Sequence, residues 1–139
     1  MNYNEYDESN YPLKEETYEI IGLSMEVHRL LGNGFSEIVY KDALEHELRT
    51  NSIHFEREKK FSITYKGIIL PHHFYADFVI NNSIILEVKA QNGIPNETLS
   101  QTINYLAASG LKVALIINFG EDKLKFKRLV FNKKYKVAC

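Results

Sequence analysis

Three charged residues lie in the most apolar part of the sequence. The segment FYADFVINNSIILEVKA, residues 74–90, reads as two strands joined by a short turn, with Asp77 in the first strand and Glu87 and Lys89 in the second. Strand side chains alternate between the two faces of a sheet, so Glu87 and Lys89 project to the same side. Two acids and a lysine on one face could hold a divalent cation and act on a phosphate group.

The length of the turn decides whether the two acids meet. A two-residue turn after Ile80 would put Asp77 on the wrong face. A three-residue turn, residues 81–83, pairs Ile80 with Ile84. That register sets Asp77 directly opposite Glu87, and we predict it because it gathers the large apolar side chains on one core face. The predicted core face consists of Phe74, Phe78, Ile80, Ile84, Leu86 and Val88.

Opposed carboxylates need compensation. Directly paired strand residues have Cβ atoms about 4.5–5.5 Å apart, and two carboxylates at that distance repel, more strongly when they are half-buried. A divalent cation bound by both acids would remove the repulsion, with Lys89 adding positive charge to the same site. A structural ion pair between Lys89 and one acid, with the other acid protonated, would also remove it. These residues alone leave both interpretations open.

The periodicity of the apolar residues predicts three helices and five strands around this pair. The predicted helices cover residues 15–31, 36–50 and 97–109, and the predicted strands cover residues 55–65, 68–80, 83–90, 112–119 and 123–131. The second helix has an apolar stripe of Ile38, Leu44 and Leu48, and Ser36 can cap it. Pro71 cannot donate to a strand ladder, so we expect pairing of the second strand to begin near His73.

The order α-α-β-β-β-α-β-β predicts an α/β fold with a mixed β-sheet flanked by helices. The helix between the third and fourth strands should form a right-handed crossover, which makes those two strands parallel. The fourth strand is apolar throughout and should be buried on both faces, whereas the lysine-rich last strand should be an edge. We expect one domain over residues 14–139, preceded by a flexible segment, residues 1–13.

Composition excludes several classes of protein. Hydrophobic residues make up 45% and charged residues 25% of the 139 residues, which is typical of globular proteins. No apolar run approaches the length that spans a bilayer, and the first residues lack the pattern of a secretory signal, so we expect a cytoplasmic protein without a membrane segment. The single cysteine, Cys139, excludes an internal disulfide framework and a cysteine-ligated zinc site.

Charge is distributed unevenly along the chain although the net charge is −1. Residues 1–50 contain 11 acidic and 4 Lys or Arg residues, whereas residues 51–139 contain 7 acidic and 13 Lys or Arg residues. This asymmetry indicates a polarised surface whose basic part is available to phosphates. The lysines of the last strand and tail could equally serve to solvate exposed strands.

The pattern of Asp77 followed by Glu87-Val88-Lys89 on the next strand resembles the D…(D/E)-x-K core of the PD-(D/E)XK nuclease superfamily. Residue 76 is Ala where the superfamily name has Pro. The segment GFSEIVY, with Gly34, Glu37 and Tyr40, resembles the signature of the GxxExxY protein family, a nuclease-like group within that superfamily. The segment QTINYL, with Gln101 and Tyr105, is similar to the Q-x-x-x-Y pattern of the recombination-repair exonuclease branch, and EVHRLLGNG, LIINFG and KRLVF also resemble GxxExxY members. The likeness covers roughly residues 18–131.

The resemblance implies a restriction-endonuclease-like (PD-(D/E)XK) core and a role for each site residue. Asp77, Glu87 and the backbone carbonyl of Val88 would bind Mg²⁺ or Mn²⁺. Lys89 would orient or deprotonate the attacking water, or neutralise charge on the phosphate. Glu37 would bind a water on the metal or a second ion. Gln101 and Tyr105, four residues apart, would present one helix face to the metal.

The implied function is metal-dependent hydrolysis of DNA or RNA phosphodiester bonds. The chain has no room for a separate recognition domain, so a homodimer mate or protein partner could supply specificity. The alternative is a non-catalytic nucleic-acid-binding or scaffolding subunit that retains the nuclease fold. For Tyr40 we expect an anchoring role against the sheet, and for Gly34 a role in backbone shape.

Overall fold

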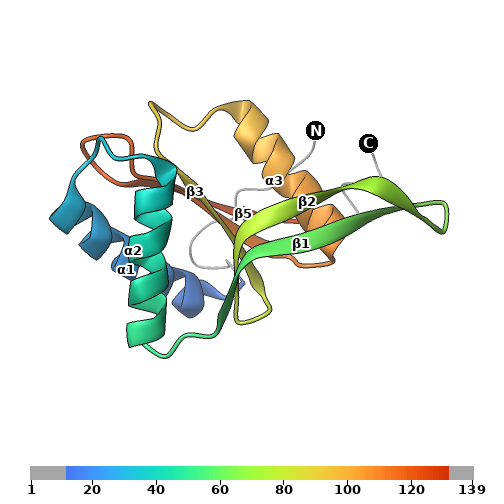
Figure 1. The fold of residues 1–139 in the computed structure, drawn as a ribbon, viewed down its shortest axis with the longest axis horizontal. Coiled ribbons are helices and arrows are strands. Elements are labelled where there is room, and N and C mark those ends of the chain that lie inside the picture. The colour runs from blue at the N-terminus through green and yellow to red at the C-terminus, as the bar shows by residue number, and fades with distance from the viewer. Residues whose placement is uncertain (1–11, 132–139) are drawn as a thin grey trace.

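The computed structural model describes residues 12–131 (Figure 1). Most of the predicted flexible segment 1–13, the lysines beyond position 132 and Cys139 lie outside the described residues. The elements are α1 (Lys14–Leu31), α2 (Glu37–Thr50), β1 (Phe55–Tyr65), β2 (Ile68–Ile80), β3 (Ile84–Lys89), α3 (Asn96–Ser109), β4 (Val113–Asn118) and β5 (Lys125–Val130). This is the predicted order, and the α/β class is confirmed.

The five strands form one mixed sheet in the order β1-β2-β3-β4-β5. The pairs are antiparallel except for β3 and β4, which run parallel. The predicted parallel pairing of the two strands that α3 connects is therefore confirmed, as are the edge position of β5 and the burial of β4, in which every residue is buried. Gly110 ends α3 in a left-handed conformation, with φ 79°, and its N–H bonds to the Leu106 carbonyl.

Helices cover both faces of the sheet, and each face has its own core (Figure 1). Residues from α1 and α2 pack on one face, where the cluster includes Ile20, Tyr40, Leu44, Phe78, Ile80, Leu86, Val88 and Ile117. Residues from α3 pack on the other face, where the cluster includes Ala76, Val79, Ile85, Leu99, Ile103, Leu106 and Ile116. The central strands β3 and β4 are buried because both helical layers meet them.

The prediction of one core face for the hairpin is wrong for Phe74. Its ring stacks on Tyr105 of α3, with centroids 4.0 Å apart, so it lies on the face opposite Phe78. The change of side coincides with an interruption of the β1–β2 ladder at Glu58 and Asp77, where Glu58 has a left-handed backbone with φ 53°. The regular alternation of β2 side chains between the two faces breaks at this point. Residues of β2 before Asp77 therefore lie on the opposite face from the one that alternation predicts.

The β1–β2 hairpin extends beyond the other strands on the right of Figure 1. Its pairing starts at Ile68, not near His73 as predicted, and reaches past Pro71. The register shifts between Ser62 and Thr64, so Pro71 lies within an irregularity that needs no ladder N–H from it.

The apolar stripe of α2 differs from the predicted one at its first position. Ile38 is 54% exposed, whereas Tyr40 is fully buried together with Leu44 and Leu48. The Tyr40 hydroxyl donates a hydrogen bond of 2.6 Å to the Gly32 carbonyl, and its ring stacks on Phe119. Tyr40 is thus an anchor between α2, the preceding loop and the sheet, as predicted.

Candidate active site

The turn between β2 and β3 sets the relation of the two acids. Asn81 and Asn82 both adopt left-handed backbone conformations, with φ 52° and 54°, which asparagine tolerates better than most residues. Ile80 pairs with Ile84 across this turn, so the three-residue turn and its register are confirmed.

Asp77 and Glu87 meet at the end of this ladder. The Asp77 N–H donates a hydrogen bond of 2.9 Å to Oε2 of Glu87. The Val88 N–H in turn donates a bond of 2.8 Å to Oδ2 of Asp77. Each carboxylate therefore accepts a backbone donor of the opposite strand, and these bonds hold the two acidic groups together where the ladder ends.

The electrostatics of this pair are unfavourable without a bound cation. Glu87 is only 7% exposed. Its burial, and then the negative charge of Asp77, raise the pKa of Glu87 to about 8. The hydrogen bond from the Asp77 N–H and the positive charge of Lys89 offset only part of that effect. A carboxyl group held in this state would gain from a nearby divalent charge.

Lys41 is a member of the site that sequence reasoning missed. Its Nζ lies 2.8 Å from Oδ1 of Asp77 and 3.2 Å from Oε1 of Glu58. Burial lowers the pKa of Lys41, but the bonds and charges of Asp77 and then Glu58 outweigh that effect and raise it overall. The signal was available, because Lys41 follows Glu37 by one helical turn and so shares the face assigned to the site.

Lys89 is positioned by the loop that follows it. It pairs with Asn118 in the parallel ladder, and its carbonyl accepts the N–H of Phe119. The fully buried Asn118 amide donates to the carbonyls of Gln91 and Gly93 and accepts the Gln91 N–H. The end of β3 is therefore tied to the end of β4.

Of the two residues predicted on α3, Tyr105 is electrostatically coupled to the two acids, whereas the role of Gln101 stays a prediction. The pKa of Tyr105 is raised by burial and then by the charges of Glu87 and Asp77, so its hydroxyl lies close enough to both acids to interact with their charges. Gln101 is exposed, and with Tyr105 it borders a largely apolar hollow of about 550 Å³ between α3 and the β1–β2 hairpin. Leu99, Ile103 and Leu106 are buried on the side of α3 that packs against the sheet.

Glu37 is one predicted site residue that the structure does not group with Asp77 and Glu87. It is half-buried at the first residue of α2. Within the described residues, no group of three or more His, Cys, Asp and Glu side chains could hold a metal ion, so Glu37 does not complete a cluster with Asp77 and Glu87. The neighbouring Gly34 has φ 109°, which fits its predicted role in backbone shape.

The sequence pattern of the PD-(D/E)XK nuclease superfamily matches residues 14–129, nearly all of the described chain. The chain belongs to this superfamily. Its members generally use divalent metal ions. No curated protein sequence matches the chain.

Two solved structures share the superfamily fold. The crystal structure of SSO0001 aligns with a TM-score of 0.54 and 20% identity, covering 72% of this chain and 53% of that one. The crystal structure of an alkaline exonuclease (LHK-Exo) from Laribacter hongkongensis aligns with a TM-score of 0.53 and 10% identity, covering 91% and 74%. The chain thus spans about half the length of SSO0001, and identities this low establish the fold alone.

The donor set of this superfamily member fits a hard cation. Asp77 and Glu87 supply carboxylate oxygens, which Mg²⁺ accepts as one or two protein ligands together with waters and substrate phosphates. Zinc sites in most cases use nitrogen or sulfur ligands, and among the described residues no three His, Cys, Asp or Glu side chains form a group that could hold a metal ion. Burial and the charge of Asp77 raise the pKa of Glu87, and a bound cation would favour the ionised form of this carboxyl group.

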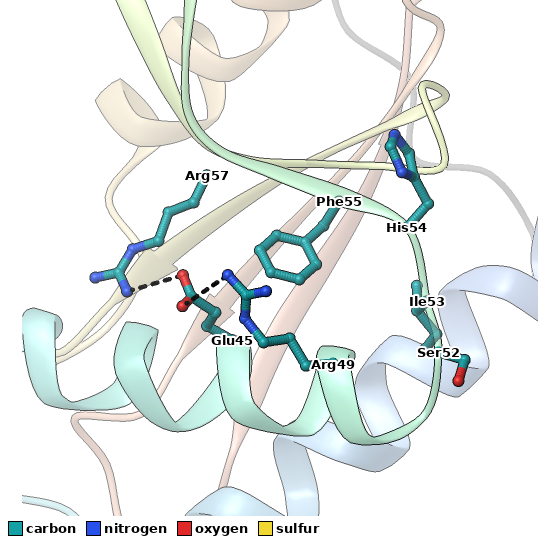
Figure 2. Close-up of a pocket in the computed structure, with 7 residues that line it drawn as sticks. All are labelled: Glu45, Arg49, Ser52, Ile53, His54, Phe55 and Arg57. Atoms are coloured by element: carbon teal, nitrogen blue, oxygen red, sulfur yellow. Dashed lines mark hydrogen bonds and ion pairs between the residues drawn. The ribbon is translucent and has the colours of Figure 1, made fainter.

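A second hollow of about 550 Å³ lies between the end of α2 and the start of β1 (Figure 2). Arg49 and Arg57 both reach Glu45 there, and Arg57 also contacts Asp42 at 2.8 Å. None of the predicted site residues lines this hollow, and acids of α2 balance both arginines.

In the described part of the chain, no helix combines the length and apolarity that crossing a bilayer requires.

Proposed function

We propose that this protein is a metal-dependent nuclease that hydrolyses DNA or RNA phosphodiester bonds. The observation that carries the proposal is the meeting of Asp77 and Glu87, which share backbone bonds across two strands while Glu87 is buried with a pKa near 8. Membership of the PD-(D/E)XK nuclease superfamily supports it, as does the fold shared with an alkaline exonuclease.

Asp77, Glu87 and the carbonyl of Val88 would hold Mg²⁺ or Mn²⁺. When bound, the ion would supply positive charge for the phosphate and lower the pKa of an attacking water. The backbone bonds from Asp77 and Val88 fix the two carboxylates before any ligand arrives, which is the preorganisation that catalysis requires.

The remaining residues would act on the water and the substrate. Lys89, two residues after Glu87 on β3, would orient the attacking water or stabilise charge developing on the phosphate. Gln101 and Tyr105 would contact the substrate from α3, beside the apolar hollow that they border. Glu37, one turn before Lys41 on α2, would hold a water or a second ion on the remaining side.

Within the superfamily we assign the chain to the GxxExxY group, which the segment GFSEIVY and the anchoring role of Tyr40 support. We also propose a cytoplasmic protein whose specificity comes from a homodimer mate or a protein partner. One observation favours a non-catalytic subunit as the second candidate: Lys41 already provides Asp77 with a positive partner.

The deciding experiment is cleavage of labelled single- and double-stranded DNA and RNA in Mg²⁺, Mn²⁺ or EDTA. We expect cleavage with either metal, none in EDTA, and a loss of about 10²-fold or more in Lys89→Ala. Lys112→Ala is the matched control, because Lys112 is exposed and lies before β4, at the end of that strand remote from Lys89. Cleavage that survives in Lys89→Ala would refute the proposed role of Lys89. A folded, metal-binding protein that cleaves none of the four substrates would favour the subunit.

A further inference from the structure

Lys41 is a cation enclosed by two acids from different strands. Its side chain is 13% exposed, and its Nζ contacts Oδ1 of Asp77 on β2 and Oε1 of Glu58 on β1. Most surface ion pairs contribute little. The Lys41–Asp77 pair is largely withdrawn from solvent, whereas Glu58 is half-exposed, and together the two contacts link α2 to both strands.

Glu58 reaches Lys41 from an unusual backbone conformation. Its φ of 53° lies in the left-handed region, in the middle of an eleven-residue strand. A residue other than glycine or asparagine adopts this conformation only at an energetic cost. The same position is the one at which the β1–β2 ladder is interrupted, directly beside Asp77. Strain of this kind clusters at functional sites.

Asp77 has both oxygens engaged. Oδ2 accepts the Val88 N–H at 2.8 Å, and Oδ1 contacts the Lys41 ammonium at 2.8 Å. A divalent ion that approaches Asp77 therefore meets a positive charge already in place. Glu58, already 3.2 Å from the same ammonium, is the partner that would remain for Lys41 if an ion took its place on Asp77.

We propose that Lys41 is a resident counter-ion of the site that passes from Asp77 to Glu58 when a divalent ion binds, and thereby sets the affinity of the site for the ion. This inference rests on the proposed function in one respect, because it assumes that Asp77 is a metal ligand. Lys41 is a positioning residue in this scheme, since it acts through Asp77. Glu58 is the acceptor that makes the exchange possible, which accounts for its strained placement.

The test is calorimetric titration of the full chain with Mn²⁺, comparing the wild type, Lys41→Met, Glu58→Gln and the double variant. Removal of the competing ammonium in Lys41→Met should tighten Mn²⁺ binding by about tenfold, because an ammonium group and a divalent cation that share one carboxylate repel each other. Removal of the acceptor in Glu58→Gln should weaken binding by about fivefold. In the Lys41→Met background, Glu58→Gln should change the affinity by less than about twofold.

The double variant separates exchange from a simple field effect. If the two charges acted independently on the ion, their effects would add, and the Glu58→Gln effect would persist without Lys41. Additive effects, or an affinity unchanged in Lys41→Met, would overturn the inference. Equal Mn²⁺ binding in all four proteins would leave the proposed function intact, whereas absence of binding in all four would remove both.

A measurement on the wild type does not depend on the folding of any variant. The ¹⁵Nζ and ¹³Cε NMR signals of Lys41 should shift as Mg²⁺ is added, because the ammonium leaves Asp77 for Glu58. The signals of the exposed Lys112 should stay in place over the same titration. Lys41 signals that do not move at metal saturation would contradict the exchange.

Discussion

At the scale of single residues, Glu87 is the group whose protonation the fold alters most clearly. Its pKa rises from 4.5 to about 8, first because it is buried and second because Asp77 lies beside it. The folded protein therefore keeps a proton on Glu87 over a pH range in which the unfolded chain has released it. Without metal, this group favours folding most below pH 4.5 and loses that contribution as the pH rises toward 8.

We predict that the metal-free protein loses stability between pH 5 and 8 and that Glu87→Gln removes most of this dependence. A difference of one pKa unit between the folded and unfolded states corresponds to about 1.4 kcal/mol, so the effect should be readily measured. Urea unfolding in EDTA at several pH values would measure it. Parallel profiles for the two proteins would mean that Glu87 does not titrate as described.

The acids were predictable from the sequence, and Lys41 was not predicted, for a physical reason. Asp77 and Glu87 stand out because charges interrupt an otherwise apolar hairpin. Lys41 stands on a polar helix face, where a lysine is ordinary, and only its packing against β2 gives it a partner. Helical spacing from Glu37 marks it as a candidate once Glu37 is itself suspected.

At the scale of elements, the close approach of two segments fixes the end of β3. A Cβ on Gly120 would lie 2.2 Å from the Gln91 nitrogen and 2.7 Å from the Ala90 carbonyl carbon, distances that backbone atoms cannot tolerate. The loop after Lys89 and the segment after β4 can therefore touch only because residue 120 is glycine. The bonds of Asn118 then hold that loop in place.

We predict that Gly120→Ala lowers the free energy of unfolding by about 1–3 kcal/mol, since the backbone around Gln91 must move. Urea denaturation would measure the change. Gly22→Ala is the control, because Gly22 is exposed within α1 and has nothing near its added Cβ. This substitution should raise the free energy of unfolding by roughly 0.5–1 kcal/mol. Equal effects of the two substitutions would refute the close-contact argument.

The register of the hairpin was predictable, but the faces of β2 beyond Asp77 were not. Apolar alternation and two asparagines fix the turn locally, so residues 78–86 follow from the sequence. Phe74 lies on the other face because the ladder breaks at Glu58, and a left-handed glutamate leaves no mark in a sequence pattern. The burial of Tyr40 in place of Ile38 has a similar reason, since the Tyr40 hydroxyl can donate to the Gly32 carbonyl only once the loop has folded.

At the scale of the whole molecule, the sheet is enclosed by two helical layers, and the acids lie among them. Glu87 belongs to β3, a strand that both layers bury. A cation that neutralises the charge of Glu87 should therefore stabilise the entire fold. A ligand that binds only the folded state raises stability by about 2.7 kcal/mol at a hundredfold excess over Kd.

We predict that saturating Mn²⁺ raises the melting temperature by on the order of 10 °C relative to EDTA. Asp77→Asn should abolish the rise, because a proposed ligand is lost. Asp42→Asn, an exposed acid of α2, should preserve it. Differential scanning calorimetry measures all three, and an equal rise in Asp77→Asn would show that the ion binds elsewhere.

The lengths of the connections also bear on the order in which the fold forms. Turns of two and three residues join β1 to β2 and β2 to β3, whereas residues 90–112 separate β3 from its parallel partner β4. Short loops close at a smaller entropic cost, so the three-strand meander should form ahead of the crossover. Asp77 and Glu87 then meet while water still solvates them. The unfavourable burial of Glu87 is deferred until α3 and β4 arrive with the apolar contacts that offset it.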